Sequence, residues 1–152
     1  FNEGGEKISR EIEKRIEKYL SSNLIPVKTS QIGKAYRFDE SGPRYIEFCK
    51  STVPSDISFS SLRIVIDCAN GACYKVSPKI FEELGAEVIT IGNLPDGYNI
   101  NQECGSTHPE IIKEAVIKHR ADFGISLDGD GDRVIIVDER GTILDGDDLL
   151  YI

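Results

Sequence analysis

The stretch Leu62-Arg63-Ile64-Val65-Ile66-Asp67 begins the region whose pattern determines the fold. Its run of β-branched residues predicts a short strand, and Asn70-Gly71 marks the turn that follows it. Beyond this point strand patterns alternate with helix patterns, at the spacing of parallel strands joined by crossover helices. The sequence therefore predicts an α/β fold, specifically a three-layer α/β/α sandwich with a mixed, mostly parallel sheet.

The elements expected after this strand follow from apolar spacing and from residues that begin or end helices. One helix ends at Leu84, just before a glycine, and Pro78 lies either at a kink or in a first turn of it. A second helix starts at Thr107, with Pro109 in the first turn and Glu110 completing a capping box. The other expected features are a strand over 86–91, a loop over 92–105, an end of the second helix near 119, a strand over 122–127, and a strand over 134–137 that runs antiparallel at one side of the sheet.

The N-terminal part of the chain carries weaker patterns. Over residues 6–20 isoleucine or leucine recurs every four residues, which predicts an amphipathic helix. Residues 21–42 are polar and are interpreted as a connector, and a short helix is expected at about 44–51. We therefore expect residues 1–42 to be the end of a preceding domain, 43–147 to be one domain, and 148–152 to begin a helix that leads to the next domain.

Composition narrows the class of protein. The chain has 152 residues, the size of one domain, and contains no methionine, so we expect it to be a piece of a longer protein. No segment approaches the ~18 apolar residues of a membrane span. The four cysteines form no C-x-x-C pair. We expect a cytoplasmic protein whose cysteines are reduced and buried, namely Cys49, Cys68, Cys73 and Cys104.

Charge is concentrated at the C-terminal end. The net charge is −8, and residues 128–152 hold 8 acidic and 2 basic groups, a balance of −6. Attraction to a phosphate-rich partner is disfavoured by this charge, so nucleic acid binding is not expected. A cation site near the C-terminal end is expected instead.

The motif D-G-D-G-D-R at residues 128–133 is the part of the sequence that indicates a chemical function. The motif follows the third predicted strand, at the end of a sheet where open α/β proteins bind ligands. Carboxylates at alternate positions repel one another, and the glycines between them allow a backbone tight enough to bring their oxygens together. Hard oxygen ligands favour Mg²⁺ or Ca²⁺. We predict a metal site at Asp128, Asp130 and Asp132, with Arg133 positioned for phosphate oxygens.

Three other interpretations of the motif are weaker. A solvated acidic turn does not explain the glycine spacing. In a calcium loop of the EF-hand type, Glu139 would be the twelfth residue, but Arg133 stands where glycine is needed and strands flank the motif. In a D-x-D phosphatase of the haloacid-dehalogenase kind, threonine or valine usually follows the second aspartate. A non-catalytic calcium-binding module stays open as an alternative.

The motif resembles the metal loop of the α-D-phosphohexomutase superfamily, which is written D-G-D-G-D-R. The resemblance covers nearly the whole chain, and several further stretches favour the glucosamine branch of that superfamily. Those stretches are 45–52, 65–72 (VIDCANGA), 84–89, 95–97 with 99–101, 105–110, 144–147 and 150–152.

The resemblance implies a four-domain enzyme, of which this chain is the second domain preceded by the tail of the first. It implies Mg²⁺ as cofactor, with Asp128, Asp130 and Asp132 as ligands and Arg133 beside a phosphoserine. That serine belongs to a T-A-S-H-N-P type loop of the first domain, which this chain lacks. The tetrapeptide at 106–109 resembles the loop only superficially, so its serine and threonine, Ser106 and Thr107, are interpreted as helix caps rather than nucleophiles.

The reaction implied by the resemblance interconverts glucosamine 6-phosphate and glucosamine 1-phosphate through a bisphosphorylated sugar. Such an enzyme is an isomerase of amino sugar metabolism that supplies peptidoglycan precursors. The implied partners are a phosphosugar substrate and the other domains of the same chain, with neither nucleic acid nor membrane. The isolated chain is expected to be inactive.

A phosphomannomutase or phosphoglucomutase of the same superfamily is the alternative, because the loops that read the sugar lie elsewhere. His108 and His119 are assigned no acid or base role, and His119 is expected near a helix C-terminus.

Overall fold

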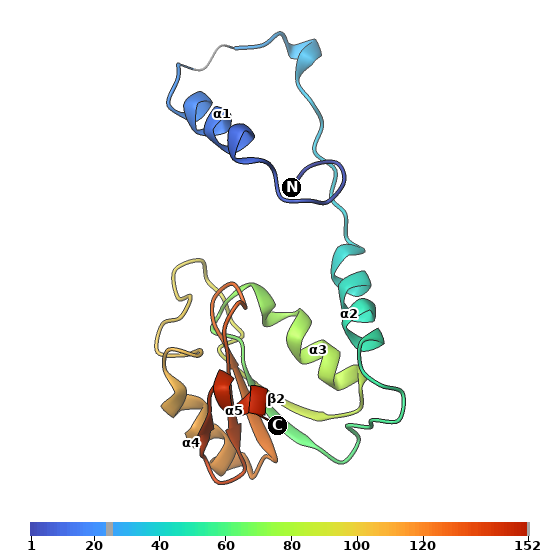
Figure 1. Ribbon diagram of the computed structural model, residues 1–152, viewed down its shortest axis with the longest axis vertical. Coiled ribbons are helices and arrows are strands. Elements are labelled where there is room, and N and C mark those ends of the chain that lie inside the picture. The colour runs from blue at the N-terminus through green and yellow to red at the C-terminus, as the bar shows by residue number, and fades with distance from the viewer. Residues whose placement is uncertain (24–25, 152) are drawn as a thin grey trace. The chain divides into compact units, whose positions relative to one another are not determined.

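The computed structural model describes residues 1–23 and 26–151 and divides into two units, Phe1–Arg37 and Phe38–Ile152 (Figure 1). Residues 24 and 25 belong to the predicted connector, and residue 152 to the predicted C-terminal helix. These three lie outside the described residues.

Among its described residues, 1–23 and 26–37, the first unit contains one α-helix. The predicted amphipathic helix is confirmed as α1 (Arg10–Leu20), but it begins four residues later than predicted. It starts there because Ser9 is the N-cap, its hydroxyl oxygen accepting a hydrogen bond from the Ile12 amide at 3.5 Å. No residue of α1 is buried, and a short 3₁₀ turn, η1 (Thr29–Gln31), follows within the predicted connector.

The second unit is built on one five-stranded sheet, which confirms the predicted α/β sandwich with a mixed sheet. The strand order is β2-β1-β3-β4-β5, with β1 parallel to both β2 and β3. β4 runs antiparallel to β3, as predicted, and β5 runs antiparallel to β4. The strands are β1 (Arg63–Asp67), β2 (Glu87–Ile91), β3 (Phe123–Leu127), β4 (Val134–Asp138) and β5 (Ile143–Leu144).

Alternation of side chains along β1 gives the sheet a core on each face. Ile64 and Ile66 are fully buried in a cluster that includes Phe81 of the helix after β1. Val65 points to the other face and is buried with Ile112 and Val116 of the helix after β2. Because successive residues of a strand point to opposite faces, a run of apolar residues is what a strand covered on both sides requires.

The elements of this unit follow the prediction with small corrections to where they begin. The short helix predicted from about 44 begins at Ser41, the strand predicted from 86 begins at Glu87, and the helix predicted from 148 begins at Gly146. Pro78 lies in the first turn of its helix, one of the two positions predicted for it. The helices are α2 (Ser41–Ser51), η2 (Ala72–Tyr74), α3 (Val76–Glu83), α4 (Pro109–His119) and α5 (Gly146–Tyr151). Within the described ranges 1–23 and 26–151, no helix is long and apolar enough to cross a membrane.

The predicted capping box at the start of α4 is wrong. The N-cap is His108, without a side-chain cap, and Pro109 is the first helical residue, where its fixed φ favours the helix. The Ser106 amide donates instead to the Leu127 carbonyl at 2.8 Å, and the Thr107 hydroxyl lies 3.1 Å from His108 Nδ1. The Ser106 hydrogen bond anchors the turn before the helix to β3. The helix ends at His119, as expected.

The prediction of four buried cysteines holds for two of them. All four are free thiols; Cys68 and Cys104 are buried, whereas Cys49 and Cys73 are partly exposed. Cys49 lies on α2 and Cys73 in the η2 turn, whereas the two buried cysteines lie in the loops that follow β1 and precede α4.

Candidate metal centre

Residues 128–133, called the acidic loop below, form the turn of a β-hairpin. They connect β3 to β4, and Leu127 pairs directly with Val134 across the base of the loop. The loop therefore leaves the carboxyl end of β3. Because β1 is parallel to β3, the segment that follows β1 reaches the same edge of the sheet.

The three aspartates of the acidic loop converge. One carboxylate oxygen each from Asp128, Asp130 and Asp132 lies within 4.8 Å of the others. Asp128 is buried, with 3% of its surface exposed, whereas the other two are exposed. The predicted ligand set is thus brought together at one point, with one member fixed in the protein and two open to solvent.

Arg133 closes the acidic loop onto its first residue. Its Nε donates to Asp128 Oδ2 at 2.9 Å, and its backbone amide donates to Asp128 Oδ1 at 3.1 Å. Burial raises the pKa of the Asp128 carboxyl, but these hydrogen bonds outweigh burial and bring that pKa to about 2. Asp128 is therefore ionised at neutral pH, and the Arg133 side chain remains 62% exposed.

Within the acidic loop, Asp132 is the aspartate whose pKa is raised by its negatively charged neighbours. The pKa of its carboxyl is raised, first by the hydrogen bond it shares with Asp128 and then by the negative charges of Asp130 and Asp128. Arg133, whose Nε lies 3.7 Å from Asp132 Oδ1, offsets only part of this repulsion. A cation between the three carboxylates would favour their ionised forms, which makes the arrangement suited to a divalent metal.

Glycines allow the close backbone approach on which the loop depends. The Ala72 amide donates to the Gly129 carbonyl at 2.8 Å. A Cβ on Gly71 would lie only 2.7 Å from Gly129 Cα, so only glycine fits at that position. Gly131 has φ +77°, a left-handed conformation that favours glycine. The sequence prediction took Asn70-Gly71 only as the end of a strand and missed this contact.

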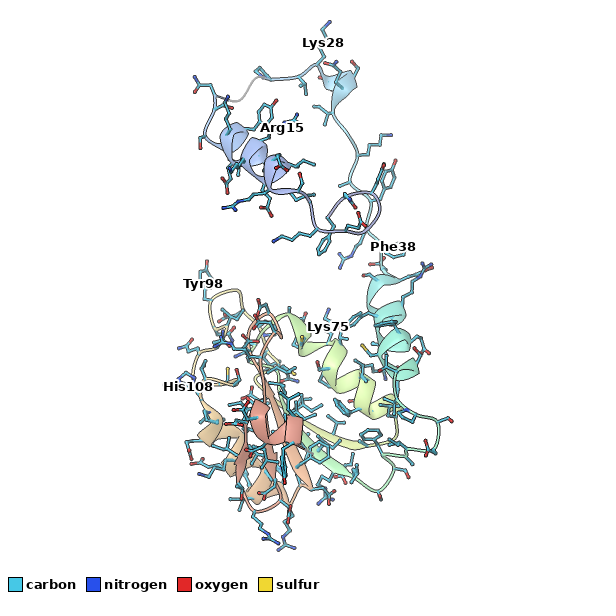
Figure 2. The ribbon with its side chains drawn as sticks, in the orientation of Figure 1. Arg15, Lys28, Phe38, Lys75, Tyr98 and His108 are labelled. Carbon is cyan, nitrogen blue, oxygen red and sulfur yellow. The ribbon has the colours of Figure 1, made fainter. Side chains whose placement is uncertain are left out.

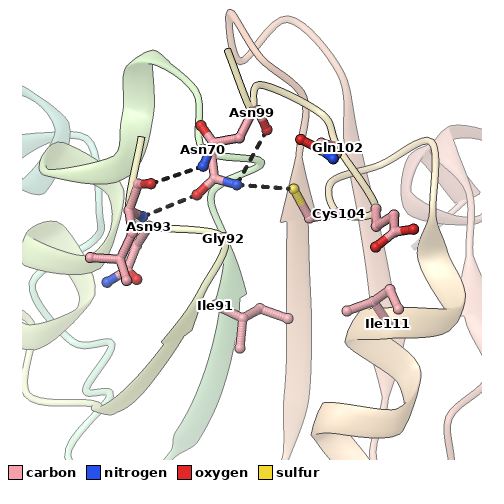
Figure 3. Close-up of a pocket in the computed structure, with 10 residues that line it drawn as sticks. Asn70, Ile91, Gly92, Asn93, Asn99, Gln102, Cys104 and Ile111 are labelled. Carbon is pink, nitrogen blue, oxygen red and sulfur yellow. Dashed lines mark hydrogen bonds between the residues drawn. The ribbon is translucent and has the colours of Figure 1, made fainter. Parts of the chain in front are cut away.

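The 92–105 loop also packs against the acidic loop. Asn70 holds this loop: its Nδ2 donates to the Asn99 carbonyl at 3.3 Å, and its Oδ1 accepts from the Leu94 amide at 3.0 Å (Figure 3). These residues line a cavity of about 370 Å³ at the carboxyl end of β2. Ile100 lies close against Gly129, where a Cβ would be 2.6 Å from Ile100 Cδ1.

His108 was assigned no acid or base role from the sequence, and it lies at the start of α4 as the residue before its first turn (Figure 2). Asp67, at the end of β1, was not predicted as a site residue, yet it is fully buried and joins several of these loops. Its position as the last residue of an apolar strand gave no signal of this role.

Comparison with known proteins identifies relatives of this chain. Residues 43–141 match the family described as phosphoglucomutase/phosphomannomutase, alpha/beta/alpha domain II. Phosphoglucosamine mutases from Marinomonas sp. (strain MWYL1) and Legionella pneumophila (strain Lens) are each 54% identical to the chain over all 152 residues. The chain covers 34% and 33% of these two proteins, so it spans about a third of the length of the curated relatives it matches.

A solved structure is similar as well. The crystal structure of a phosphoglucomutase/phosphomannomutase family protein from Burkholderia thailandensis matches with a TM-score of 0.55 at 28% identity, over 67% of this chain and 22% of that chain. The family match extends over well more than half of the residues. This chain therefore belongs to the phosphoglucomutase/phosphomannomutase family, and residues 43–141 are its α/β/α domain II.

Proposed function

We propose that this chain supplies the metal-binding domain of a phosphoglucosamine mutase. The reaction would interconvert glucosamine 6-phosphate and glucosamine 1-phosphate through a phosphoserine enzyme and a bisphosphorylated sugar. The observation that carries the proposal is the convergence of three carboxylate oxygens within 4.8 Å beside Arg133. The names of the relatives that are 54% identical favour glucosamine over the other sugars of the family.

The proposed arrangement assigns residues 1–42 to the end of a preceding domain, 43–147 to domain II, and 148–152 to a helix leading onward. The catalytic serine would come from the preceding domain, so we expect the chain to be inactive alone. Two observations support this arrangement: the family match begins at residue 43, and the relatives are about three times as long as the chain. The proposed location is the cytoplasm, where such an enzyme would serve amino sugar and peptidoglycan precursor synthesis.

The metal proposed for the acidic loop is Mg²⁺, held by Asp128, Asp130 and Asp132. The donor set fits, because all three ligands are hard carboxylate oxygens. Arg133 uses one hydrogen bond on each oxygen of Asp128, and each carboxylate oxygen can accept a second interaction. When bound, Mg²⁺ supplies positive charge that stabilises the oxygens of a phosphoryl group during transfer.

The residues of the acidic loop would orient the group that binds phosphate oxygens. Asp128 is buried and ionised, and it holds the Arg133 guanidinium through Nε. The exposed part of the guanidinium keeps N–H groups free to donate to phosphate oxygens. Positioning of this kind contributes much of the rate enhancement in phosphoryl transfer.

The structure gives no support to a calcium-binding module. The acidic loop is flanked by β3 and β4 rather than by two helices. Its sixth residue is Arg133, whose side chain pairs with Asp128, whereas an EF-hand loop has a glycine at that position.

The test is the substitution Asp130→Asn in the protein at its full natural length. Asp130 is exposed, so we expect the unfolding midpoint to stay within the error of the wild type while Mg²⁺ affinity and most turnover are lost. Asp56→Asn, at another exposed aspartate, is the matched control and should behave as the wild type. Calorimetric titration with Mg²⁺ and Ca²⁺ and a coupled mutase assay provide the measurements.

Three outcomes would contradict the proposal. Full turnover by Asp130→Asn would remove the metal role of the acidic loop. Submicromolar affinity for Ca²⁺ with indifference to Mg²⁺ would favour the calcium module. Faster turnover of mannose or glucose phosphates than of glucosamine 6-phosphate would favour the phosphomannomutase or phosphoglucomutase alternative.

A further inference from the structure

A buried carboxylate lies beneath the acidic loop. Asp67 is the last residue of β1, and none of its surface is exposed. Among residues 1–23 and 26–151 no lysine or arginine forms an ion pair with it. A carboxylate in such a place is costly unless hydrogen bonds compensate for its lost hydration, so its partners indicate what it does.

The partners of Asp67 come from three separate segments of the chain. Oδ1 accepts from the Ala69 amide at 2.9 Å, in the turn after β1. Oδ2 accepts from the Gly105 amide at 2.7 Å, in the turn before α4, and from the Ser126 hydroxyl of β3 at 3.5 Å. One side chain thus joins two loops and a neighbouring strand at the carboxyl edge of the sheet.

Each of these segments continues to the acidic loop. The turn after β1 reaches Gly129 through the Ala72 amide at 2.8 Å. The turn before α4 reaches Leu127, which immediately precedes the acidic loop, through the Ser106 amide at 2.8 Å. Ser126 itself lies on β3 two residues before Asp128. Three hydrogen-bonded routes therefore connect one buried carboxylate to residues 127–129.

We propose that Asp67 is a positioning residue for the acidic loop, fixing the backbone segments that set the spacing of its metal-binding oxygens. The effect on metal binding rests on the proposed function, whereas the effect on the loop does not. An amide cannot replace the carboxylate, because its NH₂ group would face the N–H of Ala69 or Gly105 and leave that donor unpaired. Burial raises the pKa of the Asp67 carboxyl, while the amides of Ala69 and Gly105 favour its ionised form.

The test is Asp67→Asn in the protein at its full natural length, measured by hydrogen–deuterium exchange without metal. We expect amide exchange to increase about tenfold in the segments 69–72, 105–106 and 128–133, with α4 and β4 within about twofold of the wild type. The control is Ile112→Val, a change in the buried cluster on the α4 face. This control should leave the difference in amide exchange rate between the acidic loop and the rest of the domain as it is in the wild type.

Titration with Mn²⁺, followed by electron paramagnetic resonance, provides the second measurement. Asp67→Asn should weaken Mn²⁺ binding about tenfold through the displaced loop, and Ile112→Val should leave it unchanged.

If Asp67→Asn does not fold, Ser126→Ala removes one of the three hydrogen bonds and should produce a smaller change in the same segments. Loop exchange equal to the wild type, or a uniform increase over the whole domain, would overturn the proposal. Absence of Mn²⁺ and Mg²⁺ binding by the wild type would refute the proposed function, and the exchange data would still decide the role of Asp67.

Discussion

The contact between Gly71 and Gly129 allows a quantitative test through Gly71→Ala. Gly71 has φ −100° and ψ −166°, a conformation open to any L-residue, so the substitution introduces no backbone strain. Its new methyl carbon would lie 2.7 Å from Gly129 Cα and 2.8 Å from the Gly129 carbonyl carbon. Ordinary contact between carbons requires about 3.5 to 4.0 Å. The turn after β1 and the acidic loop must therefore move apart.

The cost has two parts. Overpacking a well-filled site destabilises a protein by about 1 to 3 kcal/mol. Separation of the two backbones also breaks the hydrogen bond from the Ala72 amide to the Gly129 carbonyl, which is worth about 1 kcal/mol. We expect the free energy of unfolding to fall by about 2 to 4 kcal/mol, and the melting temperature by about 6 to 12 °C.

Urea denaturation and calorimetry in the absence of metal measure this loss. Gly42→Ala is the matched control, because beyond its chain neighbours and its own helix backbone no atom would lie within 4 Å of the new methyl group, and Gly42 belongs to α2. Alanine favours a helix, so this control should be neutral or stabilise the protein by up to about 1 kcal/mol. If Gly71→Ala unfolds within about 0.5 kcal/mol of the Gly42→Ala control, the two loops do not pack as tightly as described.

Three further predictions concern the rest of the domain. The Ile112→Ala substitution should destabilise the fold by about 2 to 5 kcal/mol in urea denaturation, because Ile112 is fully buried against β3; a loss below 1 kcal/mol would contradict its place in the core. Burial raises the pKa of the Cys68 thiol to about 12, so this thiol stays protonated at pH 8. In the folded protein, mass spectrometry should therefore find that iodoacetamide modifies Cys73 well before Cys68. Equal rates of modification of the two cysteines would refute the burial of Cys68. Lys50 Nζ donates to Glu83 at 2.6 Å and thereby lowers the pKa of the Glu83 carboxyl, so the pair stabilises the protein above the ordinary carboxyl range and loses that effect as the pH falls through the lowered pKa. The difference in melting temperature between wild type and Glu83→Gln should therefore be present at pH 7 and shrink as the protein is acidified through the carboxyl range; a difference that does not change with pH would contradict this.

Local sequence patterns were enough to predict the strands and the acidic loop. The β-branched run that contains Val65 packs on both faces of the sheet, and no other kind of segment suits that environment. The acidic loop was predictable because its three carboxylates and two glycines are consecutive, so their convergence depends on only a few backbone angles. Asp128 and Arg133 lie five residues apart, and their pairing is equally local.

What the sequence could not predict depends on contacts between distant segments. The Thr107 capping box matched a known pattern, but the Ser106 amide is committed to Leu127, and Pro109 starts the helix one residue beyond His108. Asp67 had the pattern of a strand end, and its partners Gly105 and Ser126 lie 38 and 59 residues away. The requirement for glycine at Gly71 arises in the same way, from a loop that follows a different strand.

The hairpin that carries the acidic loop has a consequence for the order of folding. Its two strands pair within a short stretch of chain, closed by Leu127 opposite Val134. Closing so short a loop costs little chain entropy, whereas pairing β1 with β3 brings together Asp67 and Ser126, 59 residues apart. The carboxylates can therefore gather early, in a hairpin that has yet to join the sheet. Their fixed arrangement also requires β1, whose buried aspartate bonds to Gly105 and to Ser126 of β3.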